Sequence, residues 1–244
     1  MSPQAPHRRR LVAAGLAALA GAALLPGWVL IEHAGAQAPT AGASPKRRWG
    51  LLIDTTRCTA SCEVCVTACQ RENGLGPARR STDAQWIRKL TVTSKAGGQQ
   101  RQVPAMCQHC AEPPCVDVCP TGASFRRADG IVLVDRHRCI GCRYCMMACP
   151  YHARSFVHEP LSGQKPEVPR GKGTVEACSL CVHRLDRGGT PACVEACVAE
   201  GHGAMLFGDL NDPESAIAKR LSEVSATRMR ADLGVDPGVA YLGI

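Results

Sequence analysis

The sequence predicts an α+β fold of short strands, small helices and long loops, arranged around its cysteines. The chain has 244 residues, of which 16 are cysteines and only 4% are aromatic. Short apolar runs, residues 51–53 and 132–134, stand shortly before two of the cysteine groups and read as strands. Because large apolar side chains are scarce, we expect the groups bound by the cysteines to serve as packing centres of the core.

The cysteines fall into four quartets with regular spacing. In chain order these are Cys58/Cys62/Cys65/Cys69, Cys107/Cys110/Cys115/Cys119, Cys139/Cys142/Cys145/Cys149 and Cys178/Cys181/Cys193/Cys197. The third quartet reads C-x2-C-x2-C-x3-C-P, the run by which bacterial ferredoxins hold [4Fe–4S] clusters. In such a run three thiolates bind one cubane and the fourth binds a neighbouring one. Sixteen thiolates therefore predict four [4Fe–4S] clusters in a ferredoxin-like fold.

Two other uses of cysteine fit this spacing less well. An even number of cysteines in an exported protein often indicates disulfides, but sets of three cysteines so close in sequence make poor disulfide partners. Structural zinc sites usually have two C-x2-C pairs about a dozen or more residues apart. Only Cys178/Cys181 with Cys193/Cys197 approaches that pattern, and its second pair is C-x3-C.

The N-terminal segment has the layout of an export signal. Arg8, Arg9 and Arg10 precede an uncharged run over residues 11–31, and small residues follow. This layout predicts a twin-arginine signal peptide over residues 1–36 and a mature protein exported in its folded state to the periplasm. The apolar run is also long enough for an uncleaved membrane anchor, although its small-residue exit favours cleavage. Residues 37–48 are expected to be a linker.

The net charge of the chain does not indicate a nucleic-acid partner. The formal charge is +8, and removal of residues 1–36 leaves about +6. Each oxidised cubane with four thiolates carries a charge of about −2. Four clusters therefore bring the mature protein close to neutrality.

The mature chain contains an internal duplication, in which a tight cysteine motif is followed by a split one in each half. The stretch LLIDTTRC before the first motif matches VLVDRHRC before the third, and PCVDVC matches PACVEAC in the split motifs. We therefore expect two pseudo-symmetric two-cluster ferredoxin modules within one domain, residues 49–204. The four motifs occupy residues 58–69, 107–119, 139–149 and 178–197.

Two segments between the cysteine motifs are expected to form elements that bind no cluster. Residues 86–93 alternate weakly and lie before the turn signal Gly97-Gly98, which predicts a hairpin. Residues 155–174 are rich in proline, glycine and charge. They form either a solvated loop or a docking surface.

The end of the chain predicts a helix. Asp212 is a suitable N-cap, Pro213 suits the first helical position, and Glu214 lies near the positive end of the helix. Gly234 marks the region beyond its C-terminus. We expect a C-terminal helical extension over residues 205–244.

The ferredoxin pattern also predicts which cysteines share a cluster. In the central stretch the fourth cysteine of each motif joins the other motif's cluster, and the outer motifs are then left to pair with each other. The four predicted ligand sets are Cys107, Cys110, Cys115 with Cys149; Cys139, Cys142, Cys145 with Cys119; Cys58, Cys62, Cys65 with Cys197; and Cys178, Cys181, Cys193 with Cys69.

With these motifs the chain resembles the iron–sulfur subunits of molybdopterin oxidoreductases and related respiratory complexes. The matching stretches include MCQHCAEPPC, from Met106, and CRYCMMACPY, from Cys142. More closely, it is similar to the exported iron–sulfur subunit of the sulfite-reduction-associated Dsr membrane complex. That resemblance implies a periplasmic multihaem cytochrome c and an integral membrane quinone-interacting subunit as partners, and attachment to the inner membrane through the complex.

The function expected from these features is electron transfer in sulfur-compound respiration or oxidation. An enzyme with its own substrate site is less consistent, because sixteen cysteines leave no cluster iron without a protein ligand. The alternative is an electron-transfer subunit of a periplasmic molybdopterin oxidoreductase or hydrogenase. His109, His137 and His183 lie close to ligand cysteines and are expected to form hydrogen bonds rather than bind iron. Arg143 and Tyr144 are expected to shield a cluster.

Overall fold

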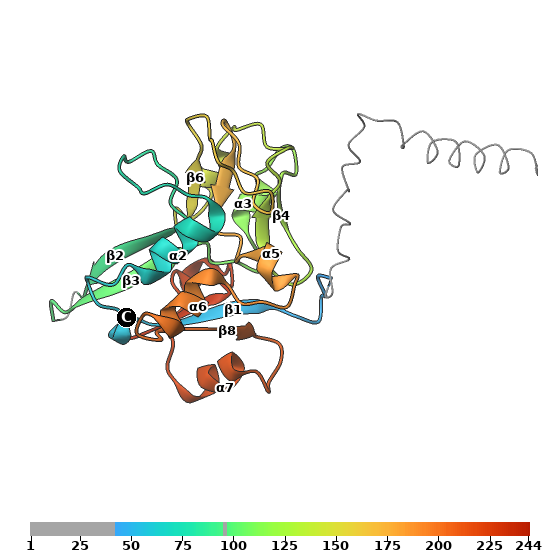
Figure 1. Ribbon diagram of the computed structural model, residues 1–244. Helices are drawn as coiled ribbons and strands as arrows, with labels where there is room; N and C mark the ends of the chain where they lie inside the picture. The colour runs from blue at the N-terminus through green and yellow to red at the C-terminus, as the bar shows by residue number, and fades with distance from the viewer. Residues whose placement is uncertain (1–41, 95–96) are drawn as a thin grey trace, which may run out of the picture. The chain divides into compact units, whose positions relative to one another are not determined.

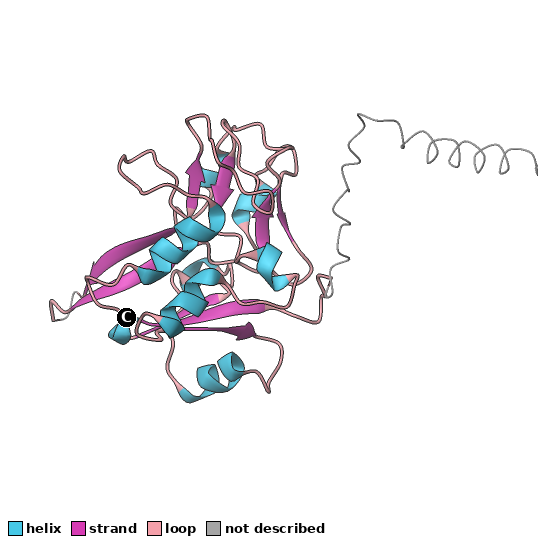
Figure 2. Ribbon diagram, in the orientation of Figure 1, coloured by secondary structure: helices cyan, strands magenta, loops and turns pink. Residues whose placement is uncertain are grey.

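The computed structural model describes residues 42–94 and 97–244. The predicted signal segment, residues 1–36, lies outside the described residues. The elements, in chain order, are β1 (Trp49–Asp54), η2 (Thr55–Arg57), α2 (Val64–Asn73), β2 (Ile87–Thr93), β3 (Gln100–Met106), α3 (Pro114–Asp117), β4 (Ser124–Arg126), β5 (Val132–Val134), α4 (Tyr144–Met147), β6 (Arg154–Phe156), β7 (Val175–Ala177), α5 (Val182–Leu185), α6 (Ala192–Ala199), β8 (Met205–Asp209), α7 (Ala216–Glu223), η3 (Ala231–Leu233) and β9 (Val239–Leu242). Short strands and small helices joined by long loops confirm the predicted α+β class (Figure 2).

The largest described sheet has three strands, in the order β8-β1-β9. The strand β1 pairs antiparallel with β8 and parallel with β9, in registers that include Leu51↔Phe207 and Leu51↔Val239. The face opposite the main core is covered by α7, whose Ile217 is fully buried against Leu52 and Ala240. Residues 205–244 thus hold two strands as well as the helix expected there.

The helix predicted from Asp212 begins one turn later than expected. Ser215 is its N-cap, and its hydroxyl accepts a hydrogen bond from the backbone N–H of Ala218 at 3.2 Å. Asp212 instead accepts the backbone N–H of Glu214 at 2.9 Å, so the polar residues before the helix form a turn. The helix ends at Glu223, whereas Gly234 closes the short η3.

The hairpin predicted after residue 86 is present. Strands β2 and β3 pair antiparallel along their whole length, from Ile87↔Met106 to Thr93↔Gln100. Short two-stranded sheets β4-β5 and β6-β7 make up the upper part of the view in Figure 1. The apolar run at residues 132–134 is β5, as its composition predicted.

Two pairs of ligand-bearing helices occupy the centre of the molecule. Helix α2 packs against α6, and α3 packs against α4; Figure 1 shows the first pair lying above the β1 sheet. Eleven of the sixteen cysteines are buried, and many belong to the main apolar core. The cysteines therefore make up much of the core of a chain that has few aromatic residues.

The segment over residues 155–174 is held near its C-terminal end by an ion pair and a hydrogen bond. The Arg170 guanidinium forms an ion pair with the fully buried Glu176 at 2.7 Å and donates to the carbonyl of Gly74 at 2.7 Å. This part of the segment is therefore held in place by the rest of the fold.

Within the described ranges, 42–94 and 97–244, no helix is long and apolar enough to span a membrane.

Candidate iron–sulfur centres

Helix starts position the third cysteine of every motif. Cys65, Cys115, Cys145 and Cys193 are each the second residue of their helix, in α2, α3, α4 and α6 respectively. In the first three motifs the earlier cysteines lie just before that helix, whereas in the fourth motif α5 lies between Cys181 and α6. This recurring arrangement is the structural form of the internal repeat seen in the sequence.

A left-handed residue before the second cysteine shapes three of the four loops. His109, Gly141 and Leu180 have φ values of 45°, 72° and 54°. The first motif has Ser61 before Cys62 and no such residue. The extra residue in its C-x3-C spacing thus replaces the tight left-handed turn of the C-x2-C motifs.

The thiols gather into four groups that cross between motifs. Group I is Cys58, Cys62, Cys65 and Cys197; group II is Cys69, Cys178, Cys181 and Cys193; group III is Cys107, Cys110, Cys115 and Cys149; group IV is Cys119, Cys139, Cys142 and Cys145. Within groups I and II, Cys197 acts electrostatically on Cys58 and Cys65, and Cys69 acts on Cys178 and Cys193. The structure therefore brings together the outer thiols that the spacing had grouped.

Groups III and IV show the same crossing. The thiol of Cys149 acts on Cys107, Cys110 and Cys115, although it belongs to the other motif. In group IV, Cys139 and Cys119 both act on Cys145. No interaction of this kind is resolved for Cys142, whose place in group IV follows from its position between Cys139 and Cys145.

Neighbouring groups also lie within electrostatic reach of one another, which gives them a linear order. Cys65 of group I acts on Cys69 and Cys193 of group II. Cys107 of group III acts on Cys178 of group II, and Cys145 of group IV acts on Cys115 of group III. The order is therefore I–II–III–IV.

Burial follows the same order. Every cysteine of groups II and III is buried, whereas both end groups contain thiols that reach towards solvent. In group I these are Cys58 and Cys62; in group IV they are Cys119, Cys139 and the exposed Cys142. All four cysteines of group I line a single cavity together with Lys89 and Met205.

Each group receives at least one hydrogen bond to a sulfur atom. Backbone N–H groups of Ala204, Leu180 and Ser124 donate to Cys197, Cys178 and Cys119 at 3.3, 3.4 and 3.3 Å. The N–H of Val175 donates to Cys139 at 3.4 Å. In group III the donor is a side chain, since Arg154 donates to Cys115 at 3.0 Å. Such donors stabilise thiolates.

The raised pKa values of these thiols show that a nearby cation is needed to hold them as thiolates. Burial, with neighbouring thiolates, raises the pKa of Cys58 to about 11 and those of Cys65 and Cys110 to about 12. Four thiolates held so close together are stable only around a positively charged centre. All sixteen cysteines are free thiols, so the donor set fits the iron of [4Fe–4S] clusters.

Among the residues that the structure describes, no three His, Cys, Asp or Glu side chains form a group that could hold a single metal ion.

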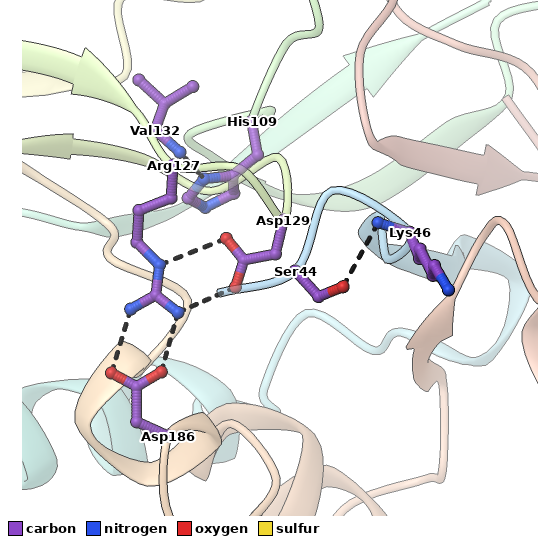
Figure 3. Close-up of polar contacts among 7 residues, drawn as sticks. All are labelled: Ser44, Lys46, His109, Arg127, Asp129, Val132 and Asp186. Atoms are coloured by element: carbon purple, nitrogen blue, oxygen red, sulfur yellow. Dashed lines mark hydrogen bonds and ion pairs between the residues drawn. The ribbon is translucent and has the colours of Figure 1, made fainter. Parts of the chain in front are cut away.

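The histidines near the cysteines have other partners. His109 is 3% exposed, and its Nδ1 accepts the backbone N–H of Val132 at 3.1 Å (Figure 3). Burial lowers its pKa to about 4, so the ring is neutral and its proton lies on Nε2. His183 pairs through Nε2 with Glu72 at 2.7 Å, and the backbone N–H of His137 donates to Asp135 at 2.9 Å.

Arg143 and Tyr144, near group IV, were expected to shield a cluster. Arg143 lies over the Phe156 ring, with its guanidinium carbon 3.9 Å from the ring centroid. Tyr144 is 55% exposed.

The sequence did not point to Arg154, the buried arginine that contacts Cys115. An isolated arginine five residues after Cys149 carries no pattern that distinguishes it from a surface charge.

Comparisons with known proteins agree with this donor set. Residues 99–210 match the family model described as a 4Fe-4S dicluster domain. The chain is 44% identical to the Hdr-like menaquinol oxidoreductase iron-sulfur subunit 1 of Archaeoglobus fulgidus, over 80% of this chain and 83% of that protein. It is 41% identical to a subunit of the tetrathionate reductase of Salmonella typhimurium, over 82% and 74%. It is 33% identical to the menaquinone reductase iron-sulfur cluster-binding subunit of Nitratidesulfovibrio vulgaris, over 81% and 89%.

Proposed function

Because the chain belongs to the 4Fe-4S dicluster family of electron-transfer iron–sulfur subunits of respiratory oxidoreductases, we propose that it relays single electrons between two redox partners. The observation that carries this proposal is the linear order of the four thiol groups, with buried groups in the middle and partly exposed groups at both ends. This arrangement suits entry of an electron at one end and exit at the other.

We assign one [4Fe–4S] cluster to each of groups I to IV. The assignment is supported by thiols that act on one another across motifs, as in Cys197 with Cys58 and Cys149 with Cys107. All sixteen cysteines serve as iron ligands in this proposal, and no other residue is needed. Each cubane, when bound, takes up and passes on one electron at a time.

The protein chain itself supplies position and insulation. The helix pairs α2–α6 and α3–α4 carry ligands of groups I–II and III–IV, and Cys178 of group II lies within electrostatic reach of Cys107 of group III. Burial of groups II and III keeps water away from the middle of the relay. Among the described residues, the thiols that are not buried all belong to the end groups, where we expect the partners to dock.

The partners that we propose are an integral membrane quinone-interacting subunit and a periplasmic multihaem cytochrome c, as in the Dsr membrane complex. The names of two relatives, a menaquinol oxidoreductase and a menaquinone reductase, support the quinone side. The process would be respiration or oxidation of a sulfur compound. The likeness to the tetrathionate reductase chain supports the alternative, a subunit of a periplasmic molybdopterin oxidoreductase.

For the whole chain we propose export by the twin-arginine pathway after the clusters have been assembled. Residues 1–36 would be the signal peptide, residues 37–48 the linker and residues 49–204 the four-cluster domain. Residues 205–244 complete the β1 sheet as a C-terminal extension. The mature protein would then be held at the periplasmic face of the inner membrane through its partners.

The relay is tested with anaerobically purified, dithionite-reduced protein. We expect it to be oxidised by a c-type cytochrome or by a membrane quinone subunit, and to show no turnover of sulfite, polysulfide or dimethyl sulfoxide. A matched sample of Cys142→Ser, which alters the exposed end of group IV, should transfer electrons more slowly to the partner at that end. Sustained reduction of any of these compounds by the isolated chain would contradict the proposal.

A further inference from the structure

Arg154 is a buried cation in direct contact with the candidate iron–sulfur centres. It lies in β6 and is 6% exposed. Its Nη2 donates to the sulfur of Cys115 at 3.0 Å and to the hydroxyl of Ser124 at 2.7 Å. The guanidinium is thus fixed at two points beside group III.

The same side chain connects group III to group IV. Ser124, which accepts from Arg154, donates its own backbone N–H to the sulfur of Cys119 at 3.3 Å. The charge of Arg154 also acts on Cys145 and on Cys107. A single cation therefore faces ligands of both groups.

The environment of Arg154 differs from that of Arg170, whose side chain is also largely buried. Arg170 forms an ion pair with the carboxylate of Glu176. The charges that act most strongly on Arg154 are instead those of Cys115, Cys107 and Cys145. Its Nη1 is buried and has no hydrogen-bond acceptor within the described residues. A buried cation needs compensating negative charge, and here ligated clusters are the available source.

The other half of the internal repeat provides a neutral counterpart. There the buried side-chain donor is Asn73, which is 1% exposed and donates through Nδ2 to the sulfur of Cys69 at 3.6 Å. An amide offers a hydrogen bond without a charge. The buried hydrogen-bond donor to a sulfur is thus neutral in groups I–II and cationic in groups III–IV, while Lys89 lines the cavity of group I and acts on Cys58.

We propose that Arg154 is a positioning residue whose fixed charge raises the reduction potentials of the clusters held by groups III and IV. Reduction adds an electron to a cluster, and a cation held beside it in a buried site stabilises the added negative charge. Without this charge both clusters would be harder to reduce, whereas the clusters of groups I and II would be unaffected. This inference rests on the proposed function, since it requires clusters in all four groups.

The test compares Arg154→Gln with wild type by redox titration followed by electron paramagnetic resonance. Cys110→Ser and Cys142→Ser serve to assign the signals of groups III and IV. In Arg154→Gln the equilibrium for reducing both of these clusters should fall roughly ten-fold, which is about 59 mV for a one-electron couple. The potentials of groups I and II should stay unchanged.

Two further variants separate charge from structure. Arg154→Lys keeps the charge, and the potentials of groups III and IV should remain near those of wild type. Arg127→Gln removes a partly buried arginine whose guanidinium pairs with the carboxylates of Asp129 and Asp186 (Figure 3). It should lower stability and leave all four potentials unchanged.

Three results would overturn the inference. They are unchanged potentials in an Arg154→Gln protein that holds four clusters, an equal shift of all four potentials, and a fall in Arg154→Lys as large as the fall expected for glutamine. If Arg154→Gln does not assemble, a fall in Arg154→Lys of the size expected for glutamine still overturns the inference. A wild-type chain that holds fewer than four clusters would contradict the proposed function instead, so the two failures can be told apart.

Discussion

Cys119 and Cys149 each end one cysteine motif and lie beside the thiols of the other. Cys149 acts on Cys107, Cys110 and Cys115, and Cys119 acts on Cys145. The backbone around Cys119 prepares it for this place. Although burial would raise its pKa, hydrogen bonds from Ser124 and Thr121 lower it. At the residue scale, crossing between motifs is what makes two clusters of one module neighbours.

Cys119→Ser should therefore remove the cluster begun by Cys139, rather than the one begun by its own motif. We expect loss of about a quarter of the iron, four atoms of sixteen, and the same loss of paramagnetic resonance signal as in Cys142→Ser. Cys110→Ser is the matched control, because it lies in the same motif as Cys119 but belongs to group III. A spectrum of Cys119→Ser that matched Cys110→Ser would contradict the cross-motif assignment.

At the element scale, the tight turn before Cys142, the second cysteine of the third motif, packs against a loop that is distant in sequence. Gly141 has φ +72°, and a Cβ at this position would lie 2.2 Å from the carbonyl oxygen of Gly173. The loop that contains Gly173 also brings the Val175 N–H to the sulfur of Cys139. The close approach of these two loops thus needs a glycine at position 141.

Gly141→Ala should accordingly disturb group IV more than backbone strain alone would. Gly163→Ala is the matched control, because its φ of +64° is similar and nothing lies within 4 Å of the added Cβ. The control should lose about 1–2 kcal/mol of stability and keep all its iron. Gly141→Ala should be less stable than the control and should lose the group IV signal, as measured by chemical denaturation and paramagnetic resonance. Equal behaviour of the two variants would argue against this contact.

The elements were predictable where local pattern decides them. The hairpin at β2–β3 and the strand β5 follow from alternation, apolar runs and turn residues in the sequence. The parallel pairing of β1 with β9 joins residues such as Leu51 and Val239, and no local signal reports so distant a partner. The start of α7 was misplaced because Asp212 and Ser215 are both good N-caps, and only the packing of Ile217 chooses between them.

The candidate site was predictable to a similar degree. The ferredoxin pattern predicted that thiols of different motifs lie near one another, and Cys197 does act on Cys58, as Cys149 does on Cys107. Ligation itself stays a prediction. Arg154 could not be found in this way, since its contact with Cys115 depends on how β6 packs beside α4, which in turn packs against α3.

On the scale of the whole molecule, the proposed export would have to follow cluster assembly, because the clusters form part of the core. Replacing Arg8, Arg9 and Arg10 with lysine should leave the protein in the cytoplasm with its clusters in place. Arg79→Lys, at an exposed arginine outside the signal segment, should have no such effect. Cell fractionation with iron analysis of each fraction measures both. Normal periplasmic levels of the triple variant would rule out the twin-arginine pathway.

The central claim, that the chain is a four-cluster electron relay, is tested most directly by the iron and acid-labile sulfide content of the anaerobically purified protein. Four cubanes predict about 16 irons and about 16 sulfides per chain. A content near eight of each, or zinc in place of iron, would contradict the account.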